Sequence, residues 1–505
     1  MPDRLSDTEF AEIRKQLVFS AIDAYMVTVE PDAYSSDRFK GYYYIGRDRW
    51  CEKPNEHAEG GGEVLLLVDE ALQDCGLAGY SSEFEQVRFE IYRLLSSWIH
   101  LPDPRDIQPI LTTVNRVFAE LSPNGTAVAA GGVNITGPGA AASGPIDGKR
   151  RRMETVLPLA FAGMAMGALG RYLDDLQQKT DNISYATLLL TLNLATEHAI
   201  WSGAQADVVA LMKDCTAKFD AVAARSVPSW DWKVALNLLT CIAEAACWFI
   251  PAVSVVARGS IGALSAIEVA ENAGASALRM NDLAVQTRVS SGAGLDTYYR
   301  VRDQLADNLR ELNAEIKNQE NDIRNQAKLM LDDMLANETY YRFDPADVAW
   351  DSGEFGDPSE ISHNAYQAGS LSGIMKEISN ILHIDARALN LHGGMIRFYI
   401  RRRAEIGIAS GYGPSAILEE LNGAISDLLE EISIEYDQGS RNVIAASNYL
   451  DAAESGSEAR LLQARSELDS VAREIEEGSG IDPLSFQDAG WYQKMPDSYP
   501  TDLRG

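Results

Sequence analysis

The chain has 505 residues, a length that allows roughly two to four domains with sizeable hydrophobic cores. Hydrophobic residues make up 46% of it and charged residues 23%, which is the composition of an ordinary globular protein. The formal net charge is −30, and this charge would repel nucleic-acid phosphates and anionic lipid surfaces. The composition therefore argues against nonspecific nucleic-acid binding.

The N-terminal stretch "MPDRLSDTEFAEIRKQLVF" is charged and lacks an apolar core, so it does not encode an ordinary Sec signal peptide. The five cysteines form no CxxC pair, and Cys241 and Cys247 would lie on nearly opposite faces of one helix. We therefore expect reduced thiols and a protein that is cytoplasmic when folded.

Residues 1–121 mix helix-like runs such as "SSEFEQVRFEIYRLLSSWI" with an aromatic, glycine-containing middle, "GYYYIGRDRWCEKPNEHAEGGGEV". We expect an N-terminal helical region there, and the sequence does not indicate its role. Residues 122–149 are small and rich in glycine, alanine and proline, which predicts a loop or linker.

Residues 150–270 contain long apolar stretches in which the apolar residues follow a regular four–three spacing. The first stripe consists of Leu169, Leu173, Leu176, Thr180, Ile183, Thr187, Leu190 and Leu194, and seven residues after Leu194 comes Trp201. The second stripe follows Gly203 and consists of Val208, Met212, Cys215, Phe219 and Val222. This spacing predicts amphipathic α-helices on both sides of the Trp-Ser-Gly sequence.

The Trp201-Ser202-Gly203 sequence predicts the corner of a helical hairpin at residues 202–203. Gly203 can take the positive φ angle that such a turn requires, and Trp201 would fill the wedge between the two diverging helices. The seam between the two helices would consist of Leu190, Leu194, Val208 and Met212.

A Trp-x-Gly motif between two long amphipathic helices resembles the WXG (ESX) helical-hairpin family of type VII secretion in actinobacteria and firmicutes. Family members place a small and then a larger apolar residue soon after the glycine, and Ala206 and Val209 of "WSGAQADVV" match that pattern. The resemblance covers about residues 153–224. It implies a protein that binds protein partners through its amphipathic helices, either another WXG-like protein or a second copy of itself.

The resemblance would also imply a Tyr-x-x-x-Asp/Glu secretion tag after the hairpin. Such spacing occurs at Tyr44–Asp48, Tyr299–Asp303 and Tyr340–Asp344. Random placement of 20 tyrosines and 74 acidic residues in 505 positions gives roughly three such pairs, so these matches do not support export. Secretion or surface exposure by a route that needs no signal peptide is therefore implied by the family resemblance alone.

Residues 234–257, "VALNLLTCIAEAACWFIPAVSVVA", are the most hydrophobic stretch and reach the length of a membrane span. The stretch fits a buried core helix, a segment that enters a membrane conditionally, or a constitutive span. In outline, long helices with a concealed apolar hairpin also resemble α-helical pore-forming toxins, which would expose residues 234–270 to a membrane. The candidate membrane-contacting residues are Trp232, Glu244, Trp248, Phe249 and Pro251.

Residues 271–343 predict a long amphipathic, coiled-coil-like helix. Its stripe consists of Leu305, Leu309, Leu312, Ile316, Gln319, Ile323, Ala327, Met330 and Met334. An acidic loop at 344–360 precedes a predicted C-terminal helical hairpin at 361–478 and a flexible tail at 479–505. The stripes of that hairpin consist of Leu418, Leu421, Ile425, Leu428 and Ile432, and of Leu461, Ala464, Leu468, Val471 and Ile475.

No sequence motif for nucleotide binding or catalysis is present: the chain has no GxxxxGK[ST], no HExxH and no GxSxG. Its six histidines are scattered, and none is paired with a cysteine at zinc spacing. Adjacent acids such as Glu419 and Glu420 would point in different directions on a helix, which disfavours an acid–base pair. We therefore expect a non-enzymatic protein with no catalytic residue, cofactor or metal.

The sequence predicts a mainly α fold of long antiparallel helices that form hairpins or bundles with coiled-coil-like packing. The leading functional expectation is a type VII secretion-associated, WXG-like protein that acts by helix–helix association. The alternatives are a membrane-active helical protein and a coiled-coil scaffold protein.

Overall fold

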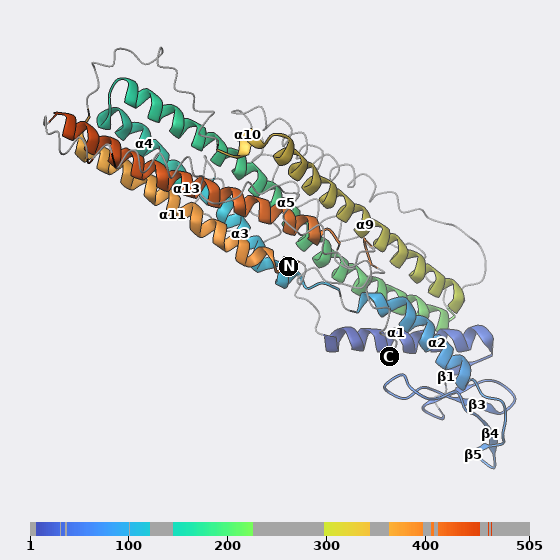
Figure 1. The fold of residues 1–505 in the computed structure, drawn as a ribbon. Coiled ribbons are helices and arrows are strands. Elements are labelled where there is room, and N and C mark those ends of the chain that lie inside the picture. Colours follow the sequence, from blue (N-terminus) through green and yellow to red (C-terminus); the bar gives the residue numbers. More distant parts are fainter. Residues whose placement is uncertain are drawn as a thin grey trace.

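One long helix, α5 (Met164–Ala223), forms the spine of the computed structural model. Its 60 residues span about 90 Å at 1.5 Å per residue, and the other helices are arranged along it as an elongated bundle (Figure 1). The structure describes residues 7–30, 32–35, 38–99, 101–121, 145–225, 297–343, 363–396, 406–408, 413–454, 463 and 466.

Two groups of helices pack along the spine. The helices around its first half are α3 (Pro104–Leu121), α4 (Pro145–Ala160), α10 (Glu338–Tyr341), α11 (Ala365–Gly393) and α13 (Ser415–Glu454). The helices around its second half are α1 (Asp7–Val29), α2 (Ser81–Leu95) and α9 (Tyr298–Ala336), with the short 3-10 helix η1 (Ser96–Trp98) after α2. Since Tyr298 lies against Phe219, and Asn182 of α5 donates to the carbonyl of Tyr340, α9 and α10 run antiparallel to the spine.

Helices α11 and α13 form an antiparallel pair whose seam carries small residues at seven-residue intervals. The hydroxyl oxygens of Ser372 and Ser440 lie 2.8 Å apart, and the Ser433 hydroxyl donates to the Ser379 carbonyl at 2.9 Å. Small side chains let two helix backbones approach closely, and the hydroxyls use that proximity for hydrogen bonds between the helices. Within the range 361–478 the structure thus pairs α11 with α13, while the predicted stripe from Leu461 to Ile475 lies outside the described residues apart from positions 463 and 466.

A five-stranded antiparallel sheet lies at the end of the bundle where α5 ends (Figure 1). Its strands follow one another in chain order: β1 (Tyr34–Ser35), β2 (Tyr42–Tyr44), β3 (Arg49–Glu52), β4 (Val64–Val68) and β5 (Ala71–Asp74). Asp69 and Glu70, which join β4 to β5, both have positive φ angles, as a two-residue type I′ hairpin turn requires.

One face of the sheet packs against α1 and α2. The cross-strand neighbours Tyr43, Cys51 and Val64 are buried on that face, and the Tyr43 hydroxyl donates to Asp23 of α1. The loop before β4 also approaches α2 closely, because a Cβ atom at Gly62 would lie 2.5 Å from the backbone nitrogen of Ser81. The sheet is thus held against the helices by its buried face and by the close approach at Gly62, where a larger residue would clash.

The prediction of a mainly α protein with long antiparallel helices is confirmed. The predicted stripe of α9 is buried from Leu305 to Met334, and the stripe of α13 is buried from Leu418 to Ile432. The sheet within residues 34–74 is a finding that the sequence pattern does not predict. Helix α4 begins at Pro145, which is inside the stretch 122–149 that is predicted as a linker.

The predicted helical hairpin with its corner at Ser202 and Gly203 is wrong, because α5 runs through both residues without a break. A glycine in a helix interior costs about 1 kcal/mol relative to alanine, whereas burying one large apolar side chain contributes about 1.5–3 kcal/mol. The burial of apolar side chains on both sides of Gly203 therefore stabilises the continuous helix by more than the glycine destabilises it. The buried residues that keep one seven-residue period through the glycine are Thr180, Thr187, Leu194, Trp201, Val208, Cys215 and Val222.

Candidate functional site

The residues predicted to form the corner and the seam lie in the core of the bundle. Trp201 is fully buried, and its indole nitrogen donates to a carboxylate oxygen of Glu197 at 3.0 Å, one helical turn earlier. The four predicted seam residues are also buried: Leu190, Leu194, Val208 and Met212. These side chains hold α5 in the bundle, and in this structure they present no surface to a partner.

Helix α5 also buries an unusual number of polar groups near Trp201. Asn193, Glu197 and His198 are all buried within the eight residues before it. Burial lowers the pKa of His198, although the charge of Asp103 opposes that shift. Within the part of the chain that the structure describes, no three His, Cys, Asp or Glu side chains are grouped to hold a metal ion.

A cluster of aromatic and charged side chains lies where α5 ends and α9 begins. Tyr298, the first residue of α9, is buried there with its ring stacked on Phe219 of α5 at a centroid distance of 5.6 Å. Tyr25 of α1 meets the same ring edge-on, also at 5.6 Å. We call this group, together with Glu90 and Arg302, the Tyr298 cluster.

Hydrogen bonds join three helices in the Tyr298 cluster, and the stacking of Phe219 adds α5 as the fourth. The Tyr298 hydroxyl donates to a carboxylate oxygen of Glu90 on α2 at 3.0 Å, and Arg302 donates to the same oxygen at 2.8 Å. The backbone nitrogen of Tyr298 donates to the Thr28 hydroxyl of α1 at 3.1 Å. Helices α1, α2, α5 and α9 therefore meet at a single aromatic ring.

The electrostatics of the cluster keep its ion pair charged and its tyrosine neutral. Burial and the charge of Glu90 raise the pKa of Tyr298 well above the value of a free tyrosine. Burial acts to raise the pKa of Glu90 as well, but hydrogen bonds from Arg302, Gln86 and Tyr298 outweigh it and lower that pKa. The cluster thus stays intact across the physiological pH range, as a fixed joint requires.

The cluster joins the two flanks of residues 226–296. On the α5 side, Arg225 donates to the carbonyl of Ala33 at 2.9 Å, next to strand β1. On the α9 side, the chain re-enters the described structure at Thr297 and reaches the Tyr298 cluster at once. We call residues 226–296 the insertion, and the described residues that flank it, Arg225 and Tyr298, both lie at the sheet end of the bundle.

The five predicted membrane-contacting residues, Trp232, Glu244, Trp248, Phe249 and Pro251, belong to this insertion and lie outside the described residues. Among the helices that the structure describes, none combines the length and the hydrophobicity that crossing a membrane requires.

The Tyr298 cluster was not predicted from the sequence. Phe219 is recognisable as a member of an apolar stripe, but nothing in the local pattern distinguishes Tyr298, Glu90 or Arg302. The single sequence signal is positional: an aromatic residue opens the first helix after the long apolar insertion.

The fold and this site define an elongated α-helical bundle with a small terminal sheet. Comparison with models of protein families, with curated proteins and with solved structures gave no match. The functional argument therefore depends on the bundle and on the insertion alone.

Proposed function

We propose that this is a non-enzymatic, membrane-active protein that places residues 234–257 of its insertion in a lipid bilayer. The observation that carries the proposal is that the most apolar stretch of the chain belongs to the insertion, and that the helices on either side of it, α5 and α9, meet at the Tyr298 cluster. Because the flanking helices are held in the bundle, the insertion can enter a bilayer while α5 and α9 keep their places.

The chemistry of the stretch fits a bilayer. Its 24 residues would span about 36 Å as a helix, slightly more than the hydrocarbon thickness of about 30 Å. Glu244 is its one charged residue, and a charge at the bilayer centre costs roughly 2.5–3.5 kcal/mol on insertion scales. That cost is small enough for the remaining apolar residues to offset, and protonation of Glu244 would remove it.

Leakage of a trapped dye from phosphatidylcholine vesicles tests the proposal. We expect the full-length protein to release the dye and Ala246→Asp to release far less, because a second central acid makes insertion about a hundredfold less favourable. Glu244→Gln should release the dye faster than the wild-type protein, since it removes the existing charge.

The matched control is Ala141→Asp, which adds the same charge within the glycine-rich stretch 122–149 and should leak as the wild-type protein does. Circular dichroism should show equal helicity for all variants. Absence of leakage at both pH 7 and pH 5, or equal leakage by wild type and Ala246→Asp, would contradict the proposal.

The association with type VII secretion stays a prediction from the Trp-x-Gly motif. Its argument from a hairpin corner no longer holds, because Trp201 and Gly203 are interior residues of α5. A scaffold function by helix–helix association also stays a prediction, and it would require no leakage from vesicles. The apolar insertion favours membrane activity over both.

A further inference from the structure

We infer that the open edge of strand β5 binds an extended, basic segment of a partner protein, which joins the sheet as a sixth strand. Strand β5 (Ala71–Asp74) is the last in the strand order of the sheet, so among the described residues it pairs with β4 on one side only. The inference goes beyond the proposed membrane activity, because no residue of the insertion takes part in it.

The backbone groups that face the open edge belong to Leu72 and Asp74. Along an antiparallel strand, residues that bond to the neighbouring strand alternate with residues whose N–H and C=O groups point away from it. Leu67 lies opposite Leu72, and its N–H donates to the Asp48 carbonyl at 2.9 Å, on the β3 side of β4. Leu67 and Leu72 are therefore a non-hydrogen-bonded pair. The N–H and C=O groups of Leu72, and those of Asp74 two residues later, point away from β4.

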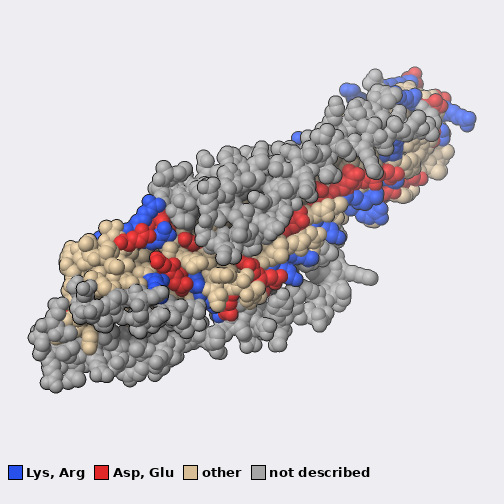
Figure 2. All heavy atoms as spheres, turned by 90° about the horizontal axis from the view of Figure 1, so that it is seen from above, with Lys and Arg blue, Asp and Glu red and all other residues tan. Residues whose placement is uncertain are grey.

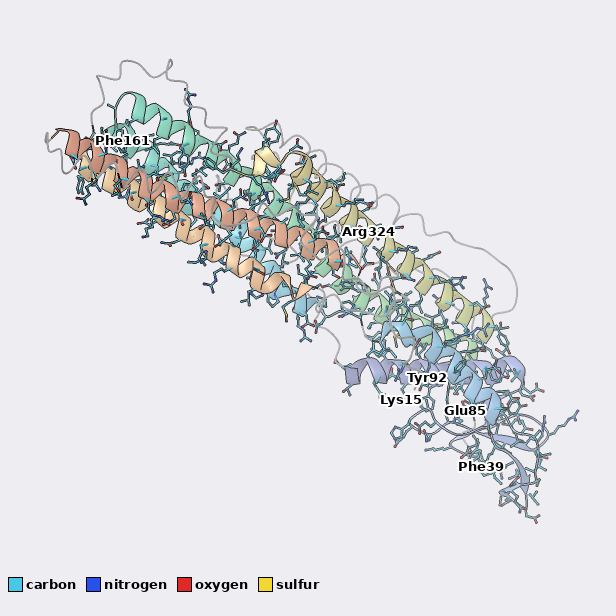
Figure 3. All side chains as sticks on the ribbon, viewed as in Figure 1. Lys15, Phe39, Glu85, Tyr92, Phe161 and Arg324 are labelled. Carbon is cyan, nitrogen blue, oxygen red and sulfur yellow. The ribbon has the colours of Figure 1, made fainter. Side chains whose placement is uncertain are left out.

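This edge is exposed at one end of the molecule. Residues 68–71 and 73–79 are all exposed, and β4 and β5 are the outermost elements of the sheet end in Figure 1. Figure 3 shows Phe39, in the loop between β1 and β2, at the same end and far from Phe161. An exposed strand edge is a template for pairing with another chain, and lysine or proline commonly blocks it. Strand β5, with the sequence ALQD, contains neither.

The charge around the edge favours a basic partner. Residues 54–87 contain eight acidic residues and no lysine or arginine, and Asp69, Glu70 and Asp74 belong to the β4–β5 hairpin itself. Both signs of charge are present at the sheet end, at the right of Figure 2, but residues 34–53 supply five lysines and arginines before β4 begins. Two copies of the acidic β5 edge would repel each other, whereas a basic strand would be attracted.

The register of the sheet defines which side chains such a strand needs. Residues directly opposite each other in an antiparallel pair have their side chains on the same face. A sixth strand antiparallel to β5 would place one residue beside Leu72, the residue two positions earlier beside Asp74, and the residue two positions later beside Glu70. An apolar residue fits the first position, and lysine or arginine fits the other two. The preferred sequence is therefore basic–x–apolar–x–basic.

Isothermal titration calorimetry of the full-length protein with the peptide acetyl-Thr-Lys-Thr-Leu-Thr-Lys-Thr-amide tests the inference. We expect the peptide to bind, and the peptide with both lysines replaced by glutamate to bind on the order of tenfold more weakly. Methylation of the leucine backbone nitrogen should abolish binding, because that N–H faces β5. Methylation of either adjacent threonine nitrogen should leave binding unchanged, because those N–H groups face away.

Two variants of the protein test the same contacts from the other side. Leu72→Pro removes an N–H from the open edge and no bond to β4, so it should abolish binding and leave the melting temperature nearly unchanged. Glu70→Gln/Asp74→Asn should weaken binding several-fold and reduce its salt dependence, and asparagine can still accept the hydrogen bond that Gly76 donates to Asp74 at 2.8 Å. The matched control is Glu311→Gln/Asp332→Asn, which removes two exposed acids from α9 and should bind as the wild type does.

Three results would overturn the inference. The first is the absence of binding at millimolar peptide, and the second is equal binding of the lysine and glutamate peptides. The third is binding that survives both methylation of the leucine nitrogen and Leu72→Pro, because neither leaves the edge able to pair. Size-exclusion chromatography of the protein alone tests the other occupant: a dimer that Leu72→Pro dissociates would show that the edge binds a second copy and would overturn the basic partner.

Discussion

Buried polar residues are the most unusual feature of this protein at the scale of single residues. The spine helix α5 buries Asn193, Glu197 and His198 beside Trp201, where an apolar stripe alone would pack more easily. Buried polar groups cost free energy unless they are paired, and the pairing fixes how the helix is rotated against its neighbours. The bond from Trp201 to Glu197 shows one such pairing, made within the helix itself.

Asp181 is a half-buried acid on the same helix whose protonation can be measured. Its carboxylate accepts from Gln177 at 2.6 Å and lies 3.8 Å from Arg150 of α4. Burial raises the pKa of Asp181 to about 6, against a value of 3.8 for a free aspartate, although Arg150 and Gln177 oppose the shift. The folded protein therefore binds this proton more tightly than the unfolded chain does.

The stability that Asp181 contributes is full below the pKa of the unfolded chain and is lost as the pH rises through about 6. Replacing it with a neutral, similarly shaped residue should remove that loss. We expect Asp181→Asn to raise the melting temperature relative to the wild type at pH 8 and to give little gain at pH 4. Differential scanning calorimetry at both values measures the difference.

The matched control is Asp332→Asn, which removes an acid from the exposed face of α9. A gain for Asp181→Asn that is equally large at pH 4 would show that ionisation of Asp181 does not limit stability.

At the scale of elements, helical periodicity predicted much of this fold. The four–three stripes of α9 and α13 are buried as expected, because a long amphipathic helix has few ways to bury a regular stripe other than against another helix. The same reasoning failed at Gly203, where a flexible residue was interpreted as a corner. Trp201, Val208, Cys215 and Val222 are spaced by seven, so the period itself already excluded a break.

The continuity of α5 can be measured directly. Spin labels at Gln178 and Lys213, both exposed, should lie about 50 Å apart along one helix, whereas a corner at Gly203 would place them about 25 Å apart. Pulsed electron paramagnetic resonance on a cysteine-free background gives this distance. A main population near the shorter distance would contradict the continuous helix.

The sheet could not be predicted for a different reason. Its strands have two to five residues, so alternation of buried and exposed side chains hardly has room to appear. What fixes the sheet is tertiary contact, such as the bond from Tyr43 to Asp23 and the packing of Gly62 on Ser81. Neither contact leaves a local pattern in the sequence.

At the scale of the whole molecule, the described residues on the two sides of the insertion meet at one place in the bundle. The Tyr298 cluster gathers Tyr25, Glu90 and Phe219, which are separated by tens to hundreds of residues in the chain. No periodicity relates such positions, which is why the cluster was found in the structure and not in the sequence. The apolar character of residues 234–257, in contrast, was readable from composition alone.

A cut in the insertion should leave the bundle intact if its base is held as described. We expect a protease site inserted after Ser229 to be cleavable without loss of helicity, and the two fragments to elute together in size-exclusion chromatography. The contacts of α5 with α9 and α13, and of α4 with α11, hold them together after the peptide bond is lost. Separation of the fragments without denaturant would show that the chain connection, and not the packing, keeps the two halves together.

The length of α5 has one further geometric consequence. A straight α-helix with a strict seven-residue repeat turns that repeat by about 20° per heptad, so between Thr180 and Val222 the buried stripe rotates by about 120°. Just before the stripe begins, Tyr172 donates to a carbonyl of α13, and near its other end Phe219 stacks on Tyr298 of α9. Deletion of a single residue near Gly203 would rotate the two ends of α5 by about 100° relative to each other about the helix axis. The correct relative orientation of the two halves therefore depends on the number of residues in α5.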